Sequence, residues 1–199
     1  MVINLKKGQS IVLDKTEYDL SQLMMGLGWD VSKKSVLGNF FGGGADFDLD
    51  AYAILLTAEN KVKNYKEDVV YYGHLQTADK SVRHSGDNLT GEGARDDECI
   101  FINLNDLSQE YEKIILGVTI YQAKERKQHF GMVHNAFVRA VDARGIEIAR
   151  YDLSGNDSYM GKISMLMAEA FRHPGGWNFR ALGGPLETDL NGIVGSFMR

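Results

Sequence analysis

Three aspartates alternate with apolar residues in the sequence GADFDLDAY, which then runs into a wholly apolar stretch. Asp46, Asp48 and Asp50 begin like the calcium loop of an EF-hand, D-x-D-x-D-G, which needs a Gly at its sixth position and a Glu at its twelfth. Ala51 and Thr57 occupy those positions here. An EF-hand is therefore excluded, and the three carboxylates need another role.

A second acidic stretch, GDNLTGEGARDDE over residues 86–98, carries five carboxylates and one arginine. Like charges at this density repel one another unless water or a cation relieves the repulsion. Asp, Glu and Asn offer only oxygen, which suits a hard cation such as Ca²⁺ with its about six to eight oxygen ligands, and glycines let the backbone bend toward one centre. The candidate ligands in this stretch are Asp87, Asn88, Glu92, Asp96, Asp97 and Glu98, and Asp30 after the sequence GLGW adds to them.

Other metals and other chemistries fit these residues less well. Softer metals prefer His or Cys, but the five His residues show no metal-binding spacing and Cys99 is single. Mg²⁺ usually keeps several waters and needs few carboxylates. The chain has no Walker A motif, no complete dinucleotide fingerprint and no nucleophile elbow. The donors therefore favour Ca²⁺ over zinc, magnesium or nucleotide binding.

The alternative is a divalent-metal-dependent enzyme. A D-x-D pair can hold a metal ion against the diphosphate of a nucleotide sugar or against another phosphate, and DFDLD has this pattern. Such an enzyme requires a basic residue beside the acids, for which Arg83, His84 and Arg95 are the candidates. It usually also contains a nucleotide-binding α/β domain, and the sequence shows no such pattern.

The composition limits the other classes of function. The chain has 199 residues, of which 44% are hydrophobic and 25% charged, as is typical of a soluble globular protein. The formal net charge of −5 argues against a nucleic-acid-binding surface. Cys99 alone gives no disulfide framework. No stretch approaches the ~18 apolar residues of a transmembrane segment, and the N-terminus lacks the apolar core of a signal peptide, so we expect a cytoplasmic protein.

The aspartates 46, 48 and 50 must be positioned by the strand that follows them. One face of this strand is apolar throughout, while the opposite face begins with the aspartates and continues with Tyr52, Ile54 and Leu56. We therefore expect a strand with an acidic beginning and a remainder that is buried on both sides. Further strands are predicted at 3–5 and 10–13, joined as a hairpin, and at 18–28, 68–72, 99–104, 113–121, 136–142, 146–153 and 175–182.

Three segments have helical features. Residues 107–113 and 127–135 are short candidates, and residues 159–173 show apolar residues at helical spacing before Pro174 and Gly175. Residues 73–98 show little strand pattern and are predicted to form a long functional loop. Many short strands with few helices predict a mainly β protein, an antiparallel sandwich or barrel, and the absence of a boundary or strong repeat predicts one domain over residues 1–199.

The motifs together resemble the TerD family of tellurite-resistance and stress-response proteins. The matching pieces are LKKGQSIVL, GLGWD, DFDLDAYAILL, SVRHSGDNLTGEGARDDECIFINL, FVRAVD, IARYDL and GGWNFRALG, in family order over essentially the whole chain. The resemblance implies a two-sheet β-sandwich with a few short helices and acidic calcium-binding loops at one end. It also implies no established enzymatic activity, and partners among the other proteins of the same resistance system, with peripheral association at the inner membrane surface.

The resemblance assigns one or two calcium ions to the acidic residues. The matched positions are Asp30, Asp46, Asp48, Asp50, Asp87, Asn88, Glu92, Asp96, Asp97 and Glu98. The chain departs from the family loop at one place, because Ala94 and Arg95 replace an Asp-Gly pair. If that Asp is a ligand, one site loses an anionic oxygen and gains a nearby positive charge, which weakens it. One calcium site is therefore expected more firmly than two.

Overall fold

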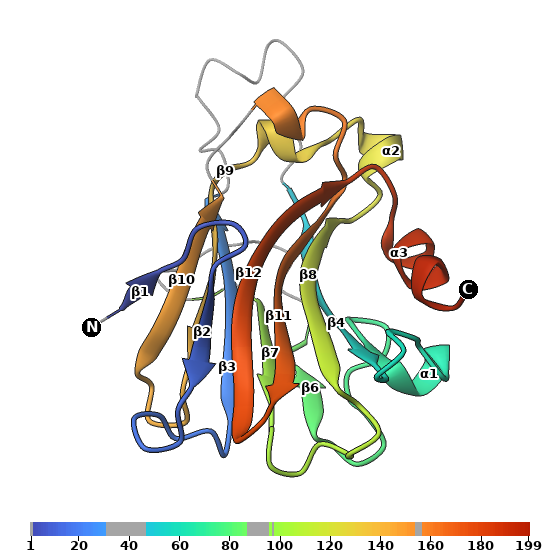
Figure 1. The fold of residues 1–199 in the computed structure, drawn as a ribbon. Coiled ribbons are helices and arrows are strands. Elements are labelled where there is room, and N and C mark those ends of the chain that lie inside the picture. Colours follow the sequence, from blue (N-terminus) through green and yellow to red (C-terminus); the bar gives the residue numbers. More distant parts are fainter. Residues whose placement is uncertain (1, 31–46, 87–95, 97, 154–156) are drawn as a thin grey trace.

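The computed structural model describes residues 2–30, 47–86, 96, 98–153 and 157–199, and the structural statements below concern these residues. Two six-stranded sheets pack face to face as a sandwich, and short helices lie at its periphery (Figure 1). All neighbouring strands within the sheets are antiparallel except one parallel pair at an edge. The prediction of a mainly β, two-sheet sandwich is confirmed.

The two sheets are named here A and B. Sheet A has the order β1-β10-β9-β3-β7-β6, with β1 Ile3–Asn4, β10 Glu147–Leu153, β9 His134–Val141, β3 Leu23–Asp30, β7 Glu98–Ile102 and β6 Val82–His84. Sheet B has the order β2-β12-β11-β8-β4-β5, with β2 Ser10–Leu13, β12 Gly176–Leu186, β11 Ser164–His173, β8 Lys113–Ile120, β4 Leu49–Leu56 and β5 Val69–Val70. The short helices are α1 Tyr65–Asp68, α2 Ala123–Arg126 and α3 Leu190–Phe197, with single 3₁₀ turns at Phe130–Met132 and Asp157–Tyr159.

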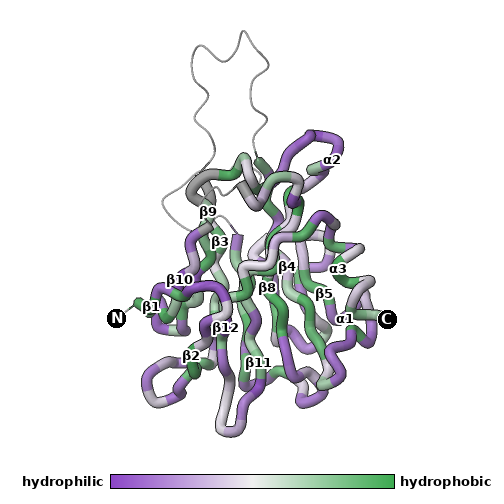
Figure 2. The backbone as a smooth tube through the Cα atoms, turned by 45° about the horizontal axis from the view of Figure 1, so that its top comes forward, coloured by the Kyte–Doolittle hydropathy of each residue, from purple (hydrophilic) through white to green (hydrophobic). Residues whose placement is uncertain are grey.

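Strand β4 is buried on both faces, as predicted. Leu49, Ala51 and the later odd-numbered residues belong to the main core between the sheets. Tyr52 and the later even-numbered residues belong to a second apolar cluster on the outer face of sheet B, which α1 and α3 cover. Figure 2 shows the hydrophobic colouring of β4, β5 and β8 beside these helices. A strand with apolar residues on both faces therefore marks the part of sheet B that is covered twice.

The two N-terminal strands do not form the predicted hairpin. Strand β1 pairs in parallel with β10 in sheet A, whereas β2 pairs with β12 in sheet B. The connection between them, which contains Gly8 at φ 82°, passes from one sheet to the other. The turn residues were recognised correctly, but each short strand pairs with a longer strand instead, β1 over two residues and β2 over four.

The predicted helix over 159–173 is wrong, because this segment is mostly strand β11. Strand β11 lies between β8 and β12 and is bulged between Leu166 and Ala168 in its register with both. A central strand that is covered on both faces has no polar alternation, and a bulge shifts its side chains by one position. Together these two effects imitated a helical spacing. Met167 in the bulge is fully buried, whereas Met160 outside the strand is 68% exposed.

The other short helices also differ from prediction. Residues 107–113 contain turns and the start of β8 rather than a helix, and residues 127–135 contain the 3₁₀ turn Phe130–Met132 and the start of β9. Helix α3, which was not predicted, begins at Asp189, whose carboxylate accepts a hydrogen bond from the backbone N–H of Gly192 at 3.0 Å. Within the predicted loop 73–98, strand β6 forms the edge of sheet A, and residues 87–95 and 97 lie outside the described residues.

The turn between β9 and β10 is built around one buried carboxylate. Asp142, which is 4% exposed, accepts hydrogen bonds from the backbone N–H groups of Asp19, Arg144 and Ile146 and from the guanidinium of Arg144. Burial alone would raise the pKa of Asp142, but these hydrogen bonds together hold it below the ordinary value of 3.8. The carboxylate thus ties the β9–β10 turn to the segment that leads into β3.

Candidate metal-binding end of the sandwich

The predicted ligands divide into those that the structure describes and those that it does not. Asp46, Asp87, Asn88, Glu92 and Asp97 lie outside the described residues. Asp30 is the last residue of β3, and only its backbone is described. The predicted ligands whose side chains are described are Asp48, Asp50, Asp96 and Glu98. Their positions show whether these four carboxylates lie close together.

Glu98 begins β7 and points between the two sheets. Its side chain is fully buried, and its Oε2 accepts a hydrogen bond from the backbone N–H of Ala51 in β4 at 2.5 Å. Among the described residues, no strand pairs with this edge of β4 at Ala51, because β5 pairs only with Ala53 and Ile54. Glu98 therefore supplies the acceptor that a missing strand would have supplied, and it joins sheet A to sheet B.

His84 of β6 completes this buried contact. Its Nδ1 accepts a hydrogen bond from the backbone N–H of Gly86 at 3.0 Å, so the proton of the neutral ring lies on Nε2. That nitrogen lies 3.4 Å from Oε2 of Glu98, and both side chains are fully buried. The two acidic stretches of the sequence are thus brought together directly, through Glu98 and Ala51, with a histidine beside them.

Asp96 lies on the other side of sheet A. Its carboxylate accepts hydrogen bonds from Nε and a terminal nitrogen of Arg139 in β9, both at 2.8 Å, and Arg139 also contacts Glu147 at 3.0 Å. The carboxylate covers Gly26 of β3, where a Cβ atom would lie 2.3 Å from it. Gly26 faces outward, because its neighbours Met25 and Leu27 face the core. The first glycine of GLGWD is therefore needed for the approach of Asp96.

Asp48 and Asp50 lie at the beginning of β4, at a different place from both Glu98 and Asp96. Asp50 is 4% exposed and lies on the outer face of sheet B, the face that carries Tyr52 and Thr119. The carboxylate of Asp48 lies 3.7 Å from the guanidinium of Arg126 in α2, and its backbone carbonyl accepts from Tyr121 N–H at 2.9 Å. Both aspartates are buried and both have interaction partners, as a buried carboxylate requires.

The described carboxylates are therefore separated by the layers of the sandwich. Asp96 lies outside sheet A, Glu98 between the sheets and Asp50 outside sheet B. Among the described residues, no group of three or more His, Cys, Asp or Glu side chains lies close enough to hold a metal ion. Carboxylate oxygens are suitable ligands for Ca²⁺, but the described residues bring too few of them together at any one of these three positions. A calcium site would therefore need further donors from the stretches 31–46 and 87–97.

Of the basic residues considered in the sequence, His84 lies beside Glu98. Arg83 lies on the outer face of sheet A, over the ring of Phe101, and donates to Gln22. Arg126 and Arg139, which do contact predicted ligands, were missed. The signal for Arg139 was a single cation within the apolar strand AFVRAV. Arg95 lies outside the described residues.

Comparison with known proteins identifies the family of this chain. The TerD domain model matches residues 1–197. The chain belongs to the TerD family. A tellurium resistance protein of Serratia marcescens, TerX, is 44% identical over 95% of this chain and 95% of its own length. The stress response protein SCP2 of Bacillus subtilis is 41% identical over 100% of both chains. The family resemblance expected from the motifs is confirmed.

Solved structures show the same TerD fold. The crystal structure of a homologue of telluride resistance protein TerD from Streptomyces coelicolor matches with a TM-score of 0.66 and 22% identity, over 87% of this chain and 95% of the other. A likeness at this identity concerns the fold alone. In the described part of this TerD chain, no helix is long and apolar enough to cross a membrane.

Proposed function

We propose that the chain is a non-enzymatic, calcium-binding TerD protein that acts in resistance to tellurium compounds or chemical stress. In this proposal Ca²⁺ orders the acidic loops, which then present a surface to a partner protein. The carrying observation is that Glu98 and Ala51, which adjoin the two acidic stretches of the sequence, are held together by a buried hydrogen bond. Loops that start from neighbouring points can direct their oxygens at a common cation.

The relatives support the biological part of this proposal. Their names describe resistance to tellurium or a response to stress, and the names of TerX and SCP2 mention no reaction. The contacts of Arg83 and His84 lend no support to a phosphate-binding enzyme, because Arg83 packs on Phe101 and the His84 side chain is fully buried. We further propose that the partners are other proteins of the same resistance system, met in the cytoplasm or at the inner membrane surface.

The layers of the sandwich bear on how many ions the proposal needs. A single ion cannot be shared by Asp96 outside sheet A and Asp50 outside sheet B. The proposed principal site therefore uses residues of 87–97 with either Asp30 and Asp46 or the beginning of β4. A second ion would use the remaining acids, and Arg95 would weaken the ion nearest to it.

Calorimetric titration of chelator-treated protein with CaCl₂, repeated with MgCl₂, tests the proposal. We expect micromolar Ca²⁺ binding, a weak Mg²⁺ response and a Ca²⁺-dependent rise in melting temperature. Asp87→Asn or Asp97→Asn should abolish that rise. Asp152→Asn is the matched control, because Asp152 is exposed on β10 and pairs with Arg150. A wild-type chain whose melting temperature and titration heat do not respond to Ca²⁺ would refute the calcium part of the proposal.

A further inference from the structure

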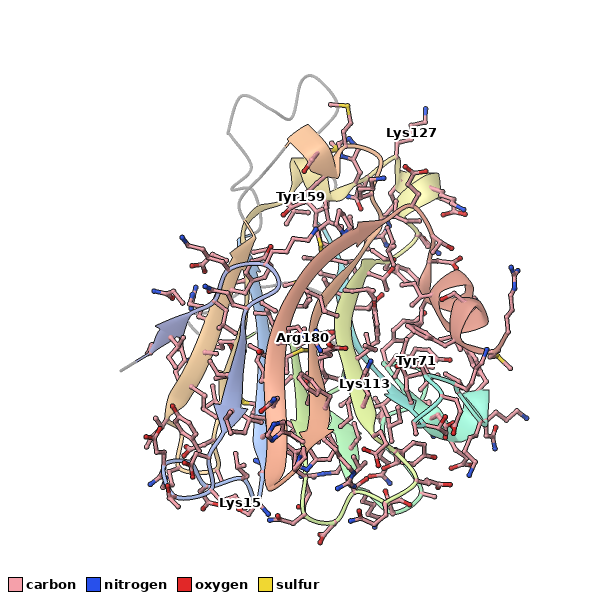
Figure 3. The ribbon with its side chains drawn as sticks, viewed as in Figure 1. Lys15, Tyr71, Lys113, Lys127, Tyr159 and Arg180 are labelled. Atoms are coloured by element: carbon pink, nitrogen blue, oxygen red, sulfur yellow. The ribbon has the colours of Figure 1, made fainter. Side chains whose placement is uncertain are left out.

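A cavity of about 280 Å³ lies on the outer face of sheet B, and five tyrosines are among its lining residues. Strands β4 and β8 form its floor. Its walls come from α1, from the residues that follow β5 and β8, and from the beginning of α3. Figure 3 labels Tyr71 in this region, between the two helices. The principal lining side chains are Tyr52, Tyr65, Tyr71, Tyr72, Tyr121, Asp50 and Asp189.

The tyrosine rings form an aromatic wall in which three of them contact one another. Tyr71 and Tyr72 meet edge to face, with ring centroids 5.3 Å apart, and Tyr72 meets Tyr121 in the same way at 6.0 Å. Edge-to-face contact is a favoured arrangement of aromatic pairs, and it holds neighbouring rings in fixed orientations. Two hydroxyls are held by the fold, because Tyr65 donates to Asn191 at 2.8 Å and Tyr52 donates to the carbonyl of Met165 at 3.4 Å. The wall is thus assembled before any ligand arrives.

The charged residues that line the cavity are two aspartates. Asp50, which is 4% exposed, lies on the strand floor, and Asp189 lies at the beginning of α3. Among the described residues that line the cavity, none is Lys, Arg or His. The guanidinium of Arg126 lies 5.1 Å from the ring centroid of Tyr121, so one ring of this wall already interacts with a cation. Arg126 itself is not a lining residue and pairs with Asp48.

We propose that this tyrosine cavity binds an organic cation, either an alkylammonium or a guanidinium group. Aromatic faces attract a cation through the ring quadrupole and suit weakly hydrated organic cations, and two carboxylates add Coulomb attraction. Ca²⁺ would be a poor occupant, because it requires about six to eight oxygen ligands and gains little from aromatic faces. The cation comes either from a free small amine or from a lysine or arginine side chain of a partner. The inference does not depend on calcium binding by the acidic loops.

Titration in the presence of chelator separates this site from any calcium site. Choline chloride is the first probe, and its neutral isostere 3,3-dimethyl-1-butanol is the matched control ligand. We expect saturable choline binding, with shifts of the amide signals of β4, β8 and the start of α3, and no comparable effect of the alcohol. N-acetyl-arginine amide is the second probe. Tighter binding of choline indicates a free amine, and tighter binding of the arginine amide indicates a side chain of a partner.

Two variants remove different parts of the site while keeping the fold. Tyr72→Leu removes the ring that joins two others and is 41% exposed, and the affinity for choline should fall by about 2- to 30-fold. Asp189→Asn removes a charge but keeps a good N-cap, and it should also weaken choline. Tyr159→Leu, in the 3₁₀ turn far from Tyr71 in Figure 3, is the control. Absence of binding by both cations, equal binding of the alcohol, or unchanged affinity in both cavity variants would overturn the proposal.

Discussion

Replacement of Glu98 by Ala separates a structural role of this carboxylate from a role as a metal ligand. In the structure, Glu98 accepts from the N–H of Ala51 at 2.5 Å and lies 3.4 Å from Nε2 of His84, with all three groups in the interior. Truncation removes the carboxylate that accepts the hydrogen bond from the N–H of Ala51 at the edge of β4. It also leaves a hole between the sheets at the point where β7 faces β4.

The magnitude follows from these two losses. A buried donor that loses its acceptor costs about 1–3 kcal/mol, and a truncated buried side chain adds a term for the remaining cavity. We expect the free energy of unfolding to fall by about 2–5 kcal/mol. For a chain of this size, each kcal/mol lowers the melting temperature by about 2–4 °C, so Glu98→Ala should melt about 4–20 °C below the wild type.

Urea denaturation in chelator and in CaCl₂ measures this effect. The loss on Glu98→Ala should be present in chelator, where no Ca²⁺ is bound. Glu98→Gln is the matched variant, because its amide oxygen can still accept from Ala51 while its NH₂ group meets the N–H of His84; its loss should be smaller, about 1–2 kcal/mol. If Glu98 served only as a calcium ligand, removing its charge would leave the metal-free chain equally stable or more stable. That result in chelator would refute the structural role.

Other substitutions test the remaining contacts by urea denaturation. Asp142→Asn should destabilise by about 2–4 kcal/mol near neutral pH because its amide accepts fewer hydrogen bonds, whereas the exposed Asp152→Asn should cost at most about 1 kcal/mol. The pKa of Asp142 is lowered in the folded chain, so the stability that its ionised carboxylate contributes is complete above the ordinary pKa of 3.8 and is lost as the pH falls through the folded-state pKa. The destabilisation caused by Asp142→Asn should therefore shrink in acid, and a destabilisation that did not shrink would contradict this. Gly26→Ala should destabilise by about 1–3 kcal/mol, because the added Cβ would clash with the carboxylate of Asp96. Gly195→Ala in α3 is the control: its Cβ meets no atom within 4 Å, and it should stabilise by about 0.5–1 kcal/mol. Equal effects of the two substitutions would refute the close approach of Asp96 to Gly26. Glu169→Gln, whose partners are Lys113 and Arg180, should cost about 1–2 kcal/mol, and a salt-independent loss would argue against ion pairing (Figure 3).

The prediction of β4 succeeded because a strand records its environment directly in its sequence. Successive side chains point to opposite faces, so the residues of DFDLDAYAILL identify an acidic beginning and a part covered on both sides. The prediction of β11 failed for a related reason. A central strand with a bulge has no alternation, and its apolar residues fit a helix equally well until the neighbouring strands β8 and β12 are known.

The amino-acid sequence by itself determined the mainly β class, the family and the oxygen-donor character of the acidic stretches, because strand alternation, motif order and ligand chemistry are local properties. The tertiary structure alone decided which carboxylates can meet. Asp96 covers Gly26 outside sheet A, Glu98 bonds to β4 between the sheets, and Asp50 faces a tyrosine cavity outside sheet B. Sheet pairing is made between residues far apart in the chain, so the side of a sheet on which a charge lies follows from the assembled register and not from spacing in the sequence.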